Sequence, residues 1–389
     1  MLALVVALAL VPHDPVPHRA PRELTCQLVP SADPSFQDRW SFVQAERFEA
    51  RRTEYVYRGQ LFSYYSFYQG YGVDAEGKAA LSYEVRITRP DGKTYHASKD
   101  HVGWKRAVPD PGSVLLAEGV VGIVFDPVDP FGSYSAWVRV TDGVTGASAE
   151  ATAEIELVEY EEGPSFADFE ALQTWKGAYL TSPELERVVP ALWMHCRSDG
   201  FLPGAKDQAL DGFLLELFGQ NDWLFAEAFD GFAKRSPAEK RGALWLLAHA
   251  PEDVEREPFV KKLSKEDAAL WAELSGAVRD PMTEPLRERH DVNEVYGRYL
   301  ASGCIDPLRR LVLALHEDGG VIANETVRDS ASGVDVPRTL VVPKVVAKLL
   351  GGLFRSDALA RSYAGALAMG DLPPGVAAAL DQLLAEAPK

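Results

Sequence analysis

The period of the hydrophobic pattern changes near Tyr160, and this change constrains the fold more than any other feature of the 389-residue chain. Before Tyr160 apolar and polar residues alternate, as in Leu81–Ile87, where Leu, Tyr, Val and Ile occupy every second position. Alternation of this kind indicates a strand with one buried and one solvated face. After Asp168 apolar residues recur every three or four positions, which is the spacing of a helix face. We therefore predict a multidomain chain, β then α.

Turn signals divide the β region into short strands. Pro90-Asp91-Gly92 and Asp142-Gly143 each lie between two alternating segments and are typical of hairpin turns. Strands of this length and spacing indicate a two-sheet β-sandwich. The strands are expected at Leu81–Arg89, Lys93–Ala97, Tyr134–Thr141 and Ser148–Val158. The domains are expected to be the sandwich over residues 38–160, a short acidic linker over 161–166 and an all-α helical array over 167–389.

Capping signals mark the predicted helix starts. Ser236-Pro237-Ala238-Glu239 has the pattern of a capping box with proline at the first helical position. Three further helices are expected to start at Ser182, Ser264 and Ser356-Asp357. Pro190 is expected to bend or split its helix, and Gly319–Pro337 is expected to be the longest loop. The pattern contains no strict internal repeat, so it supports no named repeat family.

The N-terminus carries the short apolar run Leu2–Val11. A membrane-spanning helix needs about 20 apolar residues, so we expect no integral membrane span here. The run has the length of a signal-peptide core, and we predict a signal peptide over residues 1–20 and a flexible leader over 21–37. The mature protein is then expected in the periplasm or at the cell envelope. The alternatives are a disordered apolar tail or an N-terminal strand.

Charge and cysteine content restrict the partners. The formal net charge of −17 disfavours sequence-independent binding to nucleic acid or anionic lipid. It favours neutral or cationic partners, and a protein or another envelope component is expected. The three cysteines, Cys26, Cys196 and Cys304, give no paired framework. Cys196 and Cys304 stand beside apolar residues and are expected to be buried structural thiols.

Candidate chemical groups are few. The sequence contains no Gly-x-Ser-x-Gly motif. His195 and Cys196 are adjacent on a predicted helix, where neighbours point about 100° apart and do not pair. His290-Asp291 lacks the second histidine four residues away that a zinc-binding helix has. Charged residues favoured at a helix end explain this pair more simply. We predict no catalytic residue, no metal ligand and no cofactor.

An aromatic segment supplies the candidate ligand-binding residues, which are Tyr64, Tyr65, Phe67, Tyr68 and Tyr71. Strand geometry places Tyr64 and Tyr68 on one face, and Tyr65 and Phe67 on the other. One interpretation is a central strand covered on both faces, with the helical domain covering the second face. The other is an open platform that binds a carbohydrate or a peptide.

Two sets of residues resemble known proteins. Gly72–Gly77, Arg89–Gly92 and Asp129–Tyr134 resemble segments of immunoglobulin-like modules and of an uncharacterised exported bacterial protein family. Asn293–Gly303 is similar to a helical segment of uncharacterised bacterial proteins, although Cys304 stands where an acidic or polar residue is expected. The resemblance implies an immunoglobulin-like β module followed by a C-terminal helical domain. It implies no catalytic residues.

These observations favour a non-enzymatic exported interaction or scaffold protein of the bacterial cell envelope. Two alternatives remain open. The first is a hydrolase-type enzyme with a site between the two domains. The second is a carbohydrate- or peptide-binding β module that uses the aromatic strand.

Overall fold

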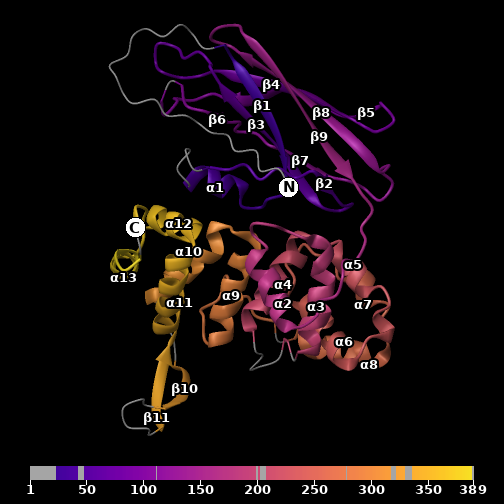
Figure 1. Ribbon diagram of the computed structural model, residues 1–389, viewed down its shortest axis with the longest axis vertical. Coiled ribbons are helices and arrows are strands. Elements are labelled where there is room, and N and C mark those ends of the chain that lie inside the picture. Colours follow the sequence, from indigo (N-terminus) through magenta and orange to yellow (C-terminus); the bar gives the residue numbers. More distant parts are fainter. Residues whose placement is uncertain are drawn as a thin grey trace. The chain divides into compact units, whose positions relative to one another are not determined.

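The computed structural model describes residues 23–42, 48–110, 112–198, 200–201, 207–276, 278–316, 321–328 and 335–387. The chain forms two compact units (Figure 1). The β unit contains the described residues up to Phe36 and those from Phe48 to Tyr160. The helical unit contains the short described segment 37–42 and the described residues from Glu161 onward. The predicted order, β then α, is confirmed, whereas the predicted signal peptide lies outside the described residues.

The first sheet of the β unit is built around one long strand. Strand β3 (Leu61–Gln69) pairs antiparallel with β1 (Thr25–Ser31), β6 (Leu115–Leu116) and β7 (Val121–Val124). Strand β1 falls inside residues 21–37, where a flexible leader was expected, and this part of the expectation is wrong. Its Pro30 is tolerated because β1 lies at an edge of the sheet, where a missing N–H breaks no ladder.

The second sheet contains five strands in the order β2-β9-β8-β4-β5. Only β2 runs parallel to its neighbour, β9. Three of the four predicted strands end within a few residues of their expected positions, and the fourth, β5, continues from Lys93–Ala97 to Trp104. The bounds are β2 Tyr55–Val56, β4 Leu81–Thr88, β5 Thr94–Trp104, β8 Gly132–Asp142 and β9 Ser148–Leu157.

Both sheets contribute side chains to one hydrophobic cluster. Alternate residues of β4 point into it, as the sequence pattern requires, and residues of β8 and β3 complete it. Each fully buried large side chain stabilises the fold by roughly 1.5–3 kcal/mol. The cluster includes Phe62, Tyr64, Tyr68, Leu81, Tyr83, Val85, Ile87, Tyr134, Ala136, Val138 and Val140.

The helical unit follows the linker, and its elements run from magenta to yellow in Figure 1. Its helices are α2 Phe169–Ala178, α3 Val188–Arg197, α4 Gln208–Gln220, α5 Leu224–Phe229, α6 Pro237–His249, α7 Glu257–Val260, α8 Lys265–Ser275, α9 Arg289–Ser302, α10 Ile305–Leu313, α11 Val342–Ser356, α12 Ala358–Ala368 and α13 Pro374–Ala385. No helix among the described residues is long and apolar enough to span a membrane.

Most predicted helix starts are correct. Ser236 forms the expected capping box with Glu239, and Ser264 accepts a hydrogen bond from the backbone of Asp267. Asp357 of the predicted Ser356-Asp357 start caps α12. The start expected at Ser182 is wrong, because α3 begins at Val188 after a 3-10 turn. Pro190 consequently lies in the first turn of α3, where its missing N–H breaks no helical bond.

The loop expected over Gly319–Pro337 is also wrong. Strands β10 (Val321–Arg328) and β11 (Asp335–Val341) form an antiparallel pair within the helical unit. Strand β10 contains four β-branched residues, which favour a strand: Val321, Ile322, Thr326 and Val327. Polar residues between them interrupt the hydrophobic pattern in the sequence. The pair ends where α11 begins (Figure 1).

Helix α1 (Phe36–Phe42) spans the boundary between the units, and its residues from Gln37 onward belong to the helical unit. Asp38 Oδ2 accepts a hydrogen bond of 2.9 Å from the backbone N–H of Ile305, the first residue of α10. The N-cap residue of α10, Cys304, makes no side-chain capping bond of its own. Ser362 donates to the carbonyl oxygen of Phe42 at 2.9 Å. Asp38 therefore caps the start of α10, a helix whose first residue lies 267 positions further along the chain.

Candidate functional site

The crossing of α4 and α9 positions a polar cluster in the helical unit. A Cβ atom on Gly212 would lie 1.9 Å from the carbonyl oxygen of Glu294. A Cβ atom on Gly297 would lie 1.9 Å from the carbonyl oxygen of Ala209. The two backbones are thus in direct contact, and only glycine fits at either position. Polar side chains on the two helices are held within reach of one another as a result.

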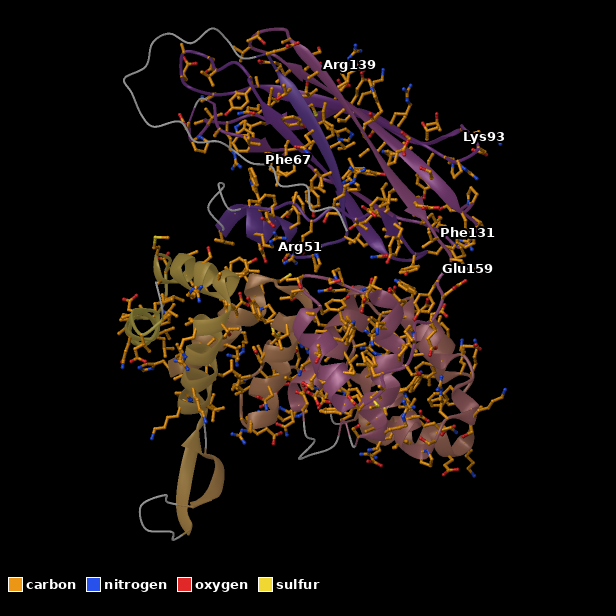
Figure 2. All side chains as sticks on the ribbon, in the orientation of Figure 1. Arg51, Phe67, Lys93, Phe131, Arg139 and Glu159 are labelled. Carbon is orange, nitrogen blue, oxygen red and sulfur yellow. The ribbon has the colours of Figure 1, made fainter. Side chains whose placement is uncertain are left out.

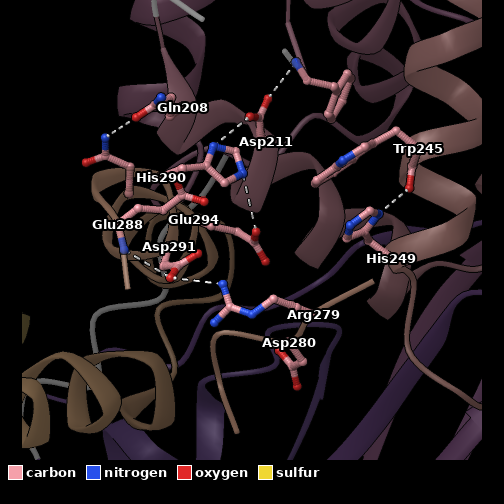
Figure 3. A network of polar contacts seen from close by, with 12 residues as sticks. Gln208, Asp211, Trp245, His249, Arg279, Asp280, Glu288, His290, Asp291 and Glu294 are labelled. Carbon is pink, nitrogen blue, oxygen red and sulfur yellow. Dashed lines mark hydrogen bonds and ion pairs between the residues drawn. The ribbon is translucent and has the colours of Figure 1, made fainter. Parts of the chain in front are cut away.

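Asp211 of α4 lies at the centre of this cluster (Figure 3). Its Oδ1 lies 2.5 Å from Nε2 of His195 and accepts a hydrogen bond of 3.2 Å from the backbone N–H of Phe201. Its Oδ2 lies 3.6 Å from Nδ1 of His290 on α9. The side chain of Asp211 is 0% exposed and that of His195 is 1% exposed. One buried carboxylate therefore ties α3, α4 and α9 together.

The cluster continues along α9. His290 Nε2 lies 3.7 Å from Glu294 Oε2, one helical turn further on (Figure 3). Glu294 accepts a hydrogen bond of 3.0 Å from Arg298, which also donates to Asp280 at 3.3 Å. Burial raises the pKa of Glu294, and the charge of Arg298 opposes that rise. We call His195, Asp211, His290, Glu294 and Arg298 the buried network.

Aromatic groups from α6 close one side of the buried network. The rings of Trp245 and His249 stack with centroids 4.0 Å apart, and the edge of Trp245 faces His290 at 6.4 Å. His249 Nδ1 donates to the carbonyl oxygen of Trp245 at 2.9 Å. Burial lowers the pKa of His249 because the charged imidazolium loses its hydration.

The buried network has little access to solvent. Its most exposed histidine, His290, has a side chain only 24% exposed. His195 Nδ1 is buried and has no hydrogen-bond partner among the described residues. The described part of the chain contains no group of three or more His, Cys, Asp and Glu residues that could hold a metal ion. The geometry fits a polar core that fixes three helices, in which the carboxylates of Asp211 and Glu294 are 0% and 5% exposed.

Cys196 does not share the partners of its neighbour His195. Its Sγ lies 4.0 Å from the carbonyl oxygen of Glu239, while a Cβ on Gly242 would approach it to 2.2 Å. Burial raises the pKa of the Cys196 thiol, so the thiolate that nucleophilic chemistry needs does not form near neutral pH. On β1, burial likewise raises the pKa of Cys26 to about 12.

The aromatic strand is β3, and its alternation is confirmed. Tyr64 and Tyr68 belong to the hydrophobic cluster to which both sheets contribute. Tyr65 and Phe67 are absent from that cluster and point the other way, toward a second set of rings. Tyr71 lies beyond the strand and is half-buried, with its hydroxyl 3.3 Å from Ser113 Oγ.

Residues of the β unit itself cover part of the second face of β3. The ring of Phe36 stacks on Tyr65 with centroids 3.7 Å apart. Phe36 and Phe48 lie 6.1 and 6.3 Å from Phe67. Tyr65 and Phe67 are thus covered by residues of the β unit, whereas the sequence pattern led us to expect that the helical domain would cover them. That a ligand binds the five aromatic residues stays a prediction.

The second face of β3 also carries aliphatic residues, with Ser63 between Leu61 and Tyr65 on the same face. Val29 of β1 lies opposite Tyr65, and Leu61 lies opposite Val124 of β7. Leu61 and Val124 are 56% and 47% exposed. We call Val29, Leu61, Tyr65, Phe67 and Val124 the outer apolar face. This face was not predicted, because no clear strand pattern in the sequence marks β1 or β7.

The corresponding face of the five-stranded sheet is charged. Glu84 of β4 lies opposite Arg139 of β8, with 4.0 Å between Oε1 and the guanidinium, and Arg139 lies 3.1 Å from Glu150 of β9. Lys99 of β5 lies 3.5 Å from Glu84. Phe67 and Arg139, both labelled in Figure 2, represent the two outer faces. A charged face of this kind is what solvent exposure favours.

No protein-family model and no curated protein matches the sequence. Solved structures give distant similarities, and the chain spans only 28% of the length of the first of them. They include a family 123 glycoside hydrolase from Clostridium perfringens, with 9% identity over 36% of this chain and a TM-score of 0.25. A CARDB domain from Pyrococcus furiosus shows 15% identity over 38% of this chain and 100% of that one, with a TM-score of 0.21. The ApaA protein of Bordetella pertussis shows 18% identity over 36% of this chain and 95% of that one, with a TM-score of 0.20. These scores carry no argument about fold or function.

Proposed function

We propose that this chain is a non-enzymatic, exported interaction protein of the bacterial cell envelope. In this proposal its β unit is an immunoglobulin-like sandwich that binds a partner protein through the outer apolar face. The single observation that carries the proposal is the cross-strand pair Leu61 and Val124, two large apolar side chains that remain about half exposed. The apolar run at Leu2–Val11 supports export.

The sandwich assignment rests on the shared core. Inward-facing residues of β3 alternate with outward-facing ones, and the same is true of β4 and β8. All three strands contribute to one hydrophobic cluster. Two sheets that pack face to face have this arrangement of side chains.

The kind of partner follows from which side chains remain open. Phe36 and Phe48 already contact the rings of Tyr65 and Phe67, so fewer aromatic faces are left to stack on a sugar. The exposed residues of the same face, Leu61 and Val124, are aliphatic and suit the apolar centre of a protein–protein interface. The net charge of −17 favours a partner with a basic rim around that centre.

The buried network supports a non-enzymatic role. General acid–base catalysis requires a carboxylate or imidazole within hydrogen-bond reach of the substrate. Asp211 and His195 are fully buried and occupied with one another. The Cys196 thiol is buried and its pKa is raised. The hydrolase-type alternative therefore receives no support from these residues.

Affinity capture with paired variants tests the proposal. Three baits are used in envelope extracts of the native host: the full chain, a Leu61→Asp/Val124→Asp double variant and an Arg86→Asp control. Arg86 is exposed and lies on the same face of β4 as Glu84, which is the charged outer face. We expect one protein to be retained by the wild type and the control, and recovered at least about tenfold less with the double variant, since interface truncations cost up to several kcal/mol. The purified partner must then bind the chain directly. Equal recovery with all three baits would refute the proposal.

A further inference from the structure

The exposed edge strand β5 carries two histidines that converge on one serine. Nε2 of His96 lies 3.0 Å from Ser98 Oγ, and Nε2 of His101 lies 2.6 Å from the same oxygen. A hydroxyl can donate one hydrogen bond and accept two, so Ser98 can pair with both imidazole nitrogens at once, and the direction of each bond depends on the histidine tautomer. Two imidazole nitrogens are thus aimed at a single point.

A β-bulge creates this convergence. Regular alternation would place His96, Ser98 and Asp100 on one face and His101 on the other. The pairing of β5 with β4 shifts here, because Ser98 lies opposite Val85 while His101 lies opposite Tyr83. Asp100 has a φ of 61°, in the left-handed region that aspartate tolerates better than most residues. The extra residue returns His101 to the face of Ser98, which is how bulges redirect side chains.

One of the two histidines is fixed and the other is accessible. The ring of His101 stacks on Tyr83 with centroids 4.9 Å apart and an angle of 22° between the planes. His96 is exposed. Strand β5 is the last strand of its sheet, with β4 as its neighbour in that sheet. A small ion can therefore approach from solvent and find one ligand already positioned.

We propose that His96 and His101 form a binding site for a divalent transition-metal ion, with Cu²⁺ bound most tightly. Imidazole nitrogen is a favoured ligand of Cu²⁺, Ni²⁺ and Zn²⁺, and the general order of affinity for such ligands ranks Cu²⁺ above the other two. Ser98 Oγ occupies the position between the two nitrogens in the absence of metal. The ion displaces its hydrogen bonds, and water completes the coordination.

The local charges permit this binding. Lys99, the basic residue within the cluster's sequence, points to the opposite face, where it pairs with Glu84 at 3.5 Å. The described part of the chain holds no set of three or more His, Cys, Asp and Glu residues arranged for a metal. The site therefore supplies two protein nitrogens, and its metal exchanges with solution rather than being retained as a structural ion.

Titration of the full chain with CuCl₂, followed by electron paramagnetic resonance, tests the proposal. We expect a spectrum with hyperfine structure from two nitrogens. His96→Ala and His101→Ala should each lower the affinity at least about tenfold, a loss that even supporting residues around metal sites produce. Ser98→Ala is the matched control, and it should retain binding because the hydroxyl is not a required ligand.

Thermal unfolding at saturating Cu²⁺ provides a second measurement that does not depend on spectroscopy. An ion that binds the folded protein raises its unfolding temperature. The rise should appear in the wild type and in Ser98→Ala, and it should be reduced in both histidine variants. Unchanged affinity in the two histidine variants, or a spectrum without two nitrogen ligands, would overturn the proposal.

Discussion

The buried network of the helical unit and the outer apolar face of the β unit differ in both chemistry and exposure. The network contains carboxylates and imidazoles, yet Asp211 and His195 are 0% and 1% exposed. The outer apolar face has no ionisable side chain except the tyrosine hydroxyl, yet Leu61 is 56% exposed. Groups able to react are thus enclosed, while the accessible surface is suited to binding. Each prediction below would strengthen or break this contrast.

The largest effect is expected at the centre of the buried network. Asp211→Ala removes the acceptor for His195 and for the backbone N–H of Phe201, and it leaves both buried. Breaking a buried pair in this way costs about 3–5 kcal/mol in unfolding free energy. Urea denaturation of the full chain measures it. Asp211→Asn keeps one acceptor oxygen and should cost less, and a loss below about 1 kcal/mol for the alanine variant would mean that the network is not structural.

A smaller loss is expected on the covered part of the outer apolar face. Phe67→Ala should lower the unfolding free energy by roughly 3 kcal/mol, because the ring is buried against Phe36 and Phe48 and its removal leaves a cavity. Leu61→Ala, on the same face but half exposed, should cost less than about 1 kcal/mol. Near-equal small losses would show that the whole face is open, as an aromatic binding platform requires.

The pH dependence of stability tests the environment of His249, the partly buried histidine of α6. The folded-state pKa of His249 lies below its usual value of 6.5 because the ring is buried. Its contribution to stability is therefore present above pH 6.5 and is lost as the pH falls through the folded-state pKa. The charges of His290 and Arg298 reinforce the shift, and Asp211 opposes it.

Replacing His249→Gln should flatten this acid-side loss, as followed by thermal unfolding between pH 7 and about pH 5. Glu294 acts with the opposite sign, because its pKa is raised and its contribution decreases as the pH rises. An unaltered slope in His249→Gln would show that this histidine is not buried in the folded protein.

The smallest effect is expected on the charged outer face. Glu84→Gln removes pairs with Arg139 and Lys99, whose side chains are 48% and 77% exposed. Exposed ion pairs contribute about 0–1 kcal/mol, so the unfolding free energy should change by less than about 0.5 kcal/mol. Added salt should remove even that difference. A loss comparable to that of Asp211→Ala would end the contrast between buried and exposed charges.

The sequence predicted those elements whose signals are local. Alternation bounded by Pro90-Asp91-Gly92 located β4, and a capping box located α6 at Ser236. Strand β1 was missed because Pro30 and the surrounding composition indicate a leader, and an edge strand tolerates proline. Strand β10 was missed because polar residues interrupt its β-branched ones.

The polar sites were less predictable, because tertiary packing creates them. Asp211 appears in the sequence as one acidic residue within an apolar helix, and Gly212 and Gly297 are the hints of a close helix crossing. His96 and His101 are five residues apart, a spacing that places them on opposite faces of a regular strand. Only the bulge at Asp100 brings them together, and its backbone conformation has no clear signature in the sequence.

Site-specific photo-crosslinking in cells of the native host tests most directly whether the outer apolar face is a binding surface. A photoreactive amino acid is placed at position 61, on the outer apolar face, or at position 86, on the charged outer face of the other sheet. The account predicts one discrete product from position 61 that contains this chain and a second protein, and none from position 86. No product from position 61, a product formed within the chain alone, or equal products from both positions would contradict it.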